Sequence, residues 1–186
     1  MYNKNQPSIS VKNITLVFWG TKSLIFQVIL IGVAVMLPAV AHLSGAPVRI
    51  LLPMHWPVIL AGLVFGWRSG ALVGLLSPSL SYLISGMPLP AILPAMTVEL
   101  FTYGFVAGFL REKLLFNPFM SVIPALIIGR VAFALTVYLG FAASGNYMQY
   151  FKAALLPGLF AALGQIILLP IIANWWVKKD QENPKN

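Results

Sequence analysis

Long apolar runs leave this chain few possible folds. The 186-residue sequence contains six such runs, at residues 23–42, 51–66, 69–86, 90–110, 118–143 and 152–177. A helix needs about 20 apolar residues to cross a bilayer, and in lipid its backbone must satisfy its own hydrogen bonds. We therefore predict an all-α integral membrane protein, a six-transmembrane-helix bundle. Because the runs 51–66 and 69–86 are short, one broken span and five helices form the alternative.

The low charge content supports this class. Only 9% of the residues are charged, whereas roughly a quarter are charged in a soluble domain. We expect a single membrane domain over residues 1–186, with residues 1–22 as a cytoplasmic or interfacial segment and residues 178–186 as a cytoplasmic tail. The twelve Lys and Arg residues are dispersed between apolar runs, so nucleic-acid binding is not expected. With no cysteine, two histidines and four acidic residues, we expect neither a metal site nor a cofactor.

Basic residues predict the orientation, because Lys and Arg accumulate on the cytoplasmic side. With both termini cytoplasmic, only Arg49 and Lys152 fall outside. Arg130 lies within a helix. The remaining nine are then cytoplasmic: Lys4, Lys12, Lys22, Arg68, Arg111, Lys113, Lys178, Lys179 and Lys185.

Glycines mark the expected helix contacts. They recur every fourth residue across the second and third runs, a spacing that lets helix backbones approach closely in lipid: Gly62, Gly66, Gly70 and Gly74. In the fourth run, Gly104 and Gly108 lie on the side away from Glu99. We interpret these positions as packing surfaces of a hairpin and of its neighbour.

Glu99 is an acid in the otherwise apolar stretch LPAMTVELFTYGF. A charge at this depth costs several kcal/mol unless it is paired, and such residues are usually functional. Tyr103 is one turn away on the same face, and Arg130 in the next run lies at a similar depth at about 1.5 Å per residue. We predict that Glu99 and Arg130 meet each other or a ligand between them. The alternative is a buried ion pair that only fixes helix register.

Other polar side chains cluster toward the outer half of the bundle and extend the candidate substrate-binding set: Arg49, His55, Trp56, Asn146 and Gln165. Prolines flank His55, so we expect it at the non-helical end of a loop. This loop is expected to fold back as a lid, with Met54 and Trp56 over a bound molecule. A lone histidine at such a position is equally often an ordinary interfacial residue.

The stretch from Leu51 to Gly104 resembles the substrate-binding membrane subunits, or S components, of energy-coupling factor (ECF) transporters. The resemblance rests on the PMHWP entry and the SGMPLP turn. It implies a six-helix protein of a prokaryotic cell membrane that captures a micronutrient from outside. It also implies three partners, namely a transmembrane coupling subunit and two cytoplasmic ATPases. Family members bind ligand through regions that correspond here to residues 43–56, Glu99, Tyr103, Arg130 and residues 146–165.

The resemblance implies a ligand from the water-soluble vitamins or related micronutrients. We favour a small anion such as pantothenate, with a pyridoxine-type vitamin, a folate and lipoate left open. Arg130 and Arg49 would pair the anionic group, Tyr103 and Trp56 would supply stacking surface, and Glu99 would accept hydrogen bonds or hold Arg130. The Ala-x-x-x-Ala pattern that many members carry on the first helix is absent, and its nearest version is Ala41-x-x-x-Gly45.

Two other function classes were considered. An autonomous secondary transporter would use Glu99 to couple uptake to protons. An intramembrane enzyme is not expected, because no nucleophile and base pair or second mid-membrane carboxylate is present. No phosphate-binding loop occurs either, so ATP hydrolysis would come from partner subunits.

Overall fold

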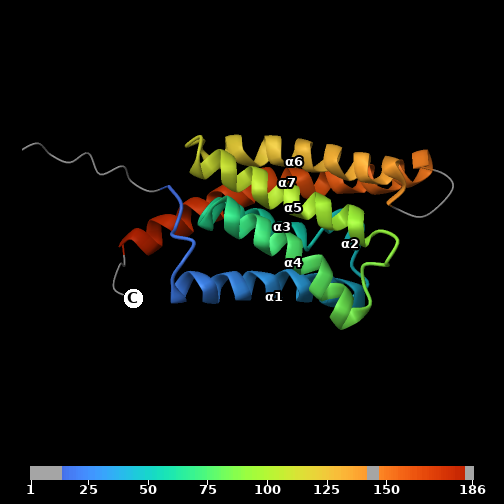
Figure 1. The fold of residues 1–186 in the computed structure, drawn as a ribbon, viewed down its shortest axis with the longest axis horizontal. Helices are drawn as coiled ribbons and strands as arrows, with labels where there is room; N and C mark the ends of the chain where they lie inside the picture. Colours follow the sequence, from blue (N-terminus) through green and yellow to red (C-terminus); the bar gives the residue numbers. More distant parts are fainter. Residues whose placement is uncertain (1–13, 142–146, 183–186) are drawn as a thin grey trace, which may run out of the picture.

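The computed structural model describes residues 14–141 and 147–182, with residues 49, 141 and 147–156 described by their backbone only. This part of the chain is entirely helical (Figure 1). Its elements are α1 (Thr21–Leu43), α2 (Val48–Leu51), α3 (His55–Phe65), α4 (Trp67–Ser85), α5 (Leu93–Glu112), α6 (Pro118–Thr136), the π-helical turn η1 (Val137–Phe141) and α7 (Tyr147–Glu182).

The all-α prediction is confirmed, but the prediction of six spans is met only in part. Within the described residues, four helices are long and apolar enough to cross a membrane: Thr21–Leu43, Leu93–Glu112, Pro118–Gly140 and Pro157–Glu182. The second run forms α3, which has 11 residues. Such a helix is about 16 Å long, whereas the hydrocarbon core is about 30 Å thick. The third run forms α4, whose serines lower its hydropathy.

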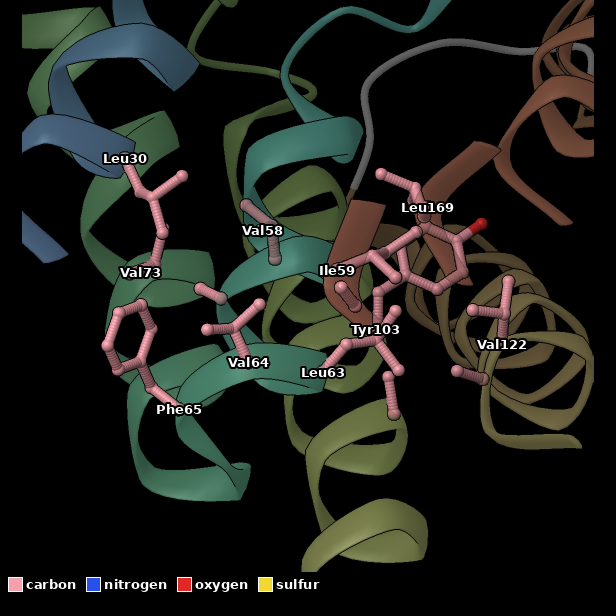
Figure 2. Close-up of a cluster of buried hydrophobic side chains, with 14 of the residues drawn as sticks. Leu30, Val58, Ile59, Leu63, Val64, Phe65, Val73, Tyr103, Val122 and Leu169 are labelled. Atoms are coloured by element: carbon pink, nitrogen blue, oxygen red, sulfur yellow. The ribbon is translucent and has the colours of Figure 1, made fainter. Parts of the chain in front are cut away.

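Helix α3 lies inside the protein. Nine of its 11 residues are buried. Figure 2 shows its Val58, Ile59 and Leu63 within a cluster that also takes Leu30 from α1 and Leu169 from α7. The first residue of this enclosed helix is His55, so the fold carries a polar side chain directly into the core.

Close glycine contacts place α5 against α3 and α4. Gly62 of α3 and Gly70 of α4 both approach the backbone of Gly104, so closely that neither position has room for a Cβ atom. Between α3 and α4 the chain turns at Gly66, whose φ of 83° is readily adopted by glycine. The predicted packing role of these glycines therefore agrees with the structure. The opposite face of α5 carries Glu99 toward α6.

The chain enters and leaves the bundle at one end, here called the terminal end (Figure 1). Lys22 near the start of α1 pairs with Asp180 near the end of α7, with 2.6 Å between Nζ and Oδ1. Six of the basic residues lie at helix ends here: Lys22, Arg68, Arg111, Lys113, Lys178 and Lys179. The opposite end, here called the distal end, holds α2, the start of α3 and the start of α5.

Candidate functional site

A carboxylate joins three helices near the distal end. The Oε1 atom of Glu99 on α5 accepts a hydrogen bond from the Tyr103 hydroxyl at 2.8 Å and lies 2.8 Å from Nη1 of Arg130 on α6. Its Oε2 atom lies 3.7 Å from Nε2 of His55 on α3. The predicted contact between Glu99 and Arg130 is therefore present, and the two residues do share a depth in the bundle.

The four side chains differ in how far they are buried. Glu99, Tyr103 and His55 are 3%, 1% and 3% exposed, whereas the Arg130 side chain is 19% exposed. The carboxylate is thus enclosed, and its Oε1 atom is occupied by two protein donors. This geometry agrees with the sequence-based expectation that Glu99 holds Arg130 in place. The guanidinium retains further N–H donors for another partner.

Glycines on α6 and α7 make room for the site. A Cβ atom on Gly129 would collide with the Tyr103 ring, and one on Gly158 would collide with Nη2 of Arg130. On Gly164 it would lie 3.0 Å from the Trp56 ring. Sequence reasoning missed Gly129, Gly158 and Gly164, because a glycine in an apolar run gives no indication of which side chain fills the space.

A cavity of about 520 Å³ lies beside Arg130, between α6 and α7. We call it the α6/α7 cavity. Its polar groups come from Tyr103, Arg130 and Gln165. Gln165 is 1% exposed, and its Nε2 atom has no hydrogen-bond partner among the described residues. The rest of the lining is nonpolar: Leu52, Ile123, Leu126, Ile127, Val131, Ala134, Gly158, Leu159, Ala162 and Ile166.

We call Glu99, Tyr103, Arg130 and His55 the Glu99 cluster, and a second cavity, of about 530 Å³, is lined by His55 of this cluster. We call it the α1/α4 cavity. His55 reaches this cavity and not the first, whereas Leu52 lines both. Leu52 has φ 44° and ψ 55°, a left-handed conformation that is costly for a leucine. The other lining residues are Pro38, Ala39, His42, Leu43, Val48, Pro53, Met54, Ser81, Ser85, Met87, Pro88 and Met96.

The expected lid differs from the structure. His55 begins α3 instead of ending a loop. Pro57 is compatible with this, because the first-turn N–H groups of a helix have no intrahelical partners. Met54 is 2% exposed and belongs to the core. Trp56 donates from Nε1 to the Leu51 carbonyl oxygen at 2.9 Å and packs near Gly164, so it joins α2 to α7.

Two predicted ligand contacts lie beyond what the structure describes. Arg49 belongs to α2, but only its backbone is described. Asn146 lies outside the described residues. The α6/α7 cavity therefore brings together Tyr103, Arg130 and Gln165 of the predicted set.

Comparison with protein-family models finds a match to the family described as ECF transporter, substrate-specific component, over residues 22–178. The chain belongs to this family. The matched range runs from the start of α1 almost to the end of α7, so it includes both cavities and the Glu99 cluster. Searches of curated proteins and of solved structures give no significant match.

Membership confirms the resemblance seen in the PMHWP and SGMPLP segments. A substrate-specific component is the substrate-binding subunit of a membrane transporter, and it works with the other components of an ECF module. The chain is thus a transport protein, and the apolar helices α1, α5, α6 and α7 agree with a place in the membrane.

Proposed function

We propose that this substrate-specific component binds a small micronutrient with high affinity in the α6/α7 cavity and delivers it to an ECF-type ABC importer. The supporting observation is that two hydrogen-bond donors, Arg130 and Gln165, line the same largely nonpolar cavity. The Arg130 guanidinium is held by Glu99 at one wall, and the Gln165 amide, whose Nε2 atom has no partner among the described residues, lies at another. Small-molecule sites commonly measure about 300–1,000 Å³ and combine apolar walls with a few convergent polar groups.

The donors define the chemical class of the ligand. Arg130 and the Gln165 amide both offer N–H groups, so they suit a carboxylate or carbonyl oxygen. Because Glu99 already balances one positive charge, a single carboxylate suits the site better than a phosphate. Aliphatic side chains surround these donors and suit an apolar ligand body. Among the vitamins named above, lipoate fits this combination better than the hydroxylated pantothenate.

The distribution of charge supports an orientation for uptake. The basic terminal end would face the cytoplasm of a prokaryotic cell, following the tendency of Lys and Arg. The distal end would then face outward. Arg130 lies ten residues before the distal end of the apolar span Pro118–Gly140, or about 15 Å from it. A ligand arriving from outside would reach Arg130 without crossing the membrane.

Native mass spectrometry of the purified chain tests the proposal. We expect a small carboxylate-bearing molecule to be retained at one per chain. Its loss on replacing Arg130 with Met, but not on replacing Arg68 with Met at the terminal end, would support the cavity as the site. A ligand retained equally by both variants would contradict it.

Reconstitution separates the coupled importer from the proton-coupled alternative. We expect vesicles that contain only this chain to bind the ligand without accumulating it. Accumulation by this chain alone, abolished by an uncoupler, would instead favour the proton-coupled transporter.

A further inference from the structure

The α1/α4 cavity concentrates one kind of chemistry. Both histidines of the chain and three of its seven methionines line it, although they come from distant segments: His42, Met54, His55, Met87 and Met96. Imidazole and thioether groups are donors with lone pairs and no formal charge. Soft metal ions such as Cu⁺ prefer these donors, whereas Mg²⁺ and Ca²⁺ prefer oxygen.

The environment of His55 is that of a metal ligand. Its side chain is 96% buried, and neither ring nitrogen has a hydrogen-bond partner among the described residues. Nε2 faces the Glu99 carboxylate at 3.7 Å. Metal-bound histidines commonly donate a hydrogen bond from their second nitrogen to a carboxylate, and Nε2 of His55 lies near one, although beyond hydrogen-bond distance. With Nε2 so oriented, Nδ1 is left without a partner and can donate its lone pair to an ion.

We propose that the α1/α4 cavity binds one soft monovalent metal ion, Cu⁺, through these imidazoles and thioethers. This goes beyond the proposed uptake function and does not depend on it. Considering only Cys, His and acidic residues, the sequence predicts no metal site. The described residues contain no group of three or more His, Cys, Asp or Glu that could hold an ion. The site therefore depends on the methionines.

Charge favours a monovalent ion over a divalent one. No carboxylate lines the cavity, and the nearby Glu99 is already paired with Arg130. A metal ion bound in this cavity would keep its full positive charge while losing solvation by water. The desolvation cost of an ion rises with the square of its charge. Zn²⁺ would meet this larger cost without the thiolate or carboxylate ligands that usually offset it.

The five candidate metal ligands differ in how exposed they are. Met54 and His55 are buried, whereas Met87 is 46% exposed and His42 is also exposed. Met96, which is partly buried, lies between these extremes. Methionine has three rotatable bonds, so its thioether can move to complete a coordination sphere. The exposed donors can capture an ion, and His55 with Met54 can retain it.

Calorimetric titration with Ag⁺, a redox-inert probe of the same charge and softness, tests the proposal on the whole purified chain in detergent. We expect one strongly bound ion. Replacing Met87 and Met96 together with Leu should weaken binding at least about 100-fold, since changes outside the ligand shell alone cost about 10- to 100-fold. Leucine nearly conserves the side-chain volume, so the packing should survive. Circular dichroism verifies this, and the two single variants serve if the double variant fails to fold.

The matched control replaces Met36 and Met120 with Leu. Both are exposed, at 65% and 59%, and neither lines the cavity. This control should bind Ag⁺ like the original chain. Equal affinities for the cavity and control variants would overturn the proposal, as would tighter binding of Zn²⁺ than of Ag⁺.

His55→Gln provides a second readout. Glutamine keeps an N–H group near Glu99 but removes the Nδ1 lone pair. X-ray absorption of the Cu⁺-loaded chain should show sulfur and nitrogen neighbours, with less nitrogen in His55→Gln. A spectrum without sulfur neighbours in the original chain would contradict thioether coordination.

Discussion

Arg111 and Arg130 are two arginines of one small bundle with different surroundings. Arg111, at the terminal end of α5, is 4% exposed and donates from Nη2 to Oδ1 of Asn174 on α7 at 3.0 Å. Arg130 is paired with a carboxylate, is more exposed and borders a cavity. A buried guanidinium that donates to a neutral amide holds two helices together. A guanidinium that is paired with a carboxylate and partly exposed is also available to a ligand. The surroundings of an arginine, more than its presence in a helix, indicate its function.

Removing Arg130 should have the largest effect. Arg130→Met leaves Glu99 buried without its charged partner, so the free energy of unfolding should fall by about 3–5 kcal/mol. Ligand affinity should fall at least about 100-fold, because a charged contact is lost. Chemical unfolding in detergent and native mass spectrometry measure the two effects.

The double variant Glu99→Gln/Arg130→Met separates these effects. It removes both charges, so most of the stability should return while the ligand stays absent. If ligand retention also returned, Arg130 would have only a structural role and the contrast with Arg111 would disappear.

Removing Arg111 should affect stability alone. Arg111→Met removes the hydrogen bond that the charged guanidinium donates to Asn174, an exposed residue, which should cost about 1.5–3 kcal/mol. Thermal unfolding checks the stability. Any loss of ligand retention in Arg111→Met would contradict the assigned difference between the two arginines.

Gly158→Ala should move Arg130 without removing it. The new methyl group would meet Nη2, so the guanidinium must shift. We expect ligand affinity to fall about 10-fold, equivalent to about 1.4 kcal/mol. The control is Gly32→Ala, where a Cβ atom meets nothing within 4 Å. Titration calorimetry with the identified ligand should show a change only for Gly158→Ala.

Gln165→Leu should have the smallest effect. One neutral hydrogen bond contributes about 0.5–1.5 kcal/mol, so affinity should fall about 2- to 10-fold. Because Nε2 lacks a partner in the described structure, thermal stability should not fall. A clear loss of stability would show that Gln165 supports the fold instead of binding a ligand.

Much of the site was predictable because it depends on distance along helices. Glu99 and Tyr103 are four residues apart and therefore neighbours on α5. Arg130 lies at a matching depth, so its contact with Glu99 followed from the rise per residue. The prediction that His55 lies at the non-helical end of a loop was wrong. The flanking prolines suggested a loop around His55, but the first turn of a helix also accepts proline, and burial of the apolar α3 places His55 in the core.

Hydropathy and helix geometry were enough to predict a helical membrane protein and the pair formed by Glu99 and Arg130, and the resemblance of the PMHWP and SGMPLP segments predicted the family. These properties depend on composition and on residues close in the chain. Only the tertiary structure decided that Glu99 is enclosed, that Gln165 faces the same cavity as Arg130, and that His55 reaches a different one. The rotation of each helix about its axis sets these outcomes, and that rotation depends on glycine contacts between segments far apart in the sequence.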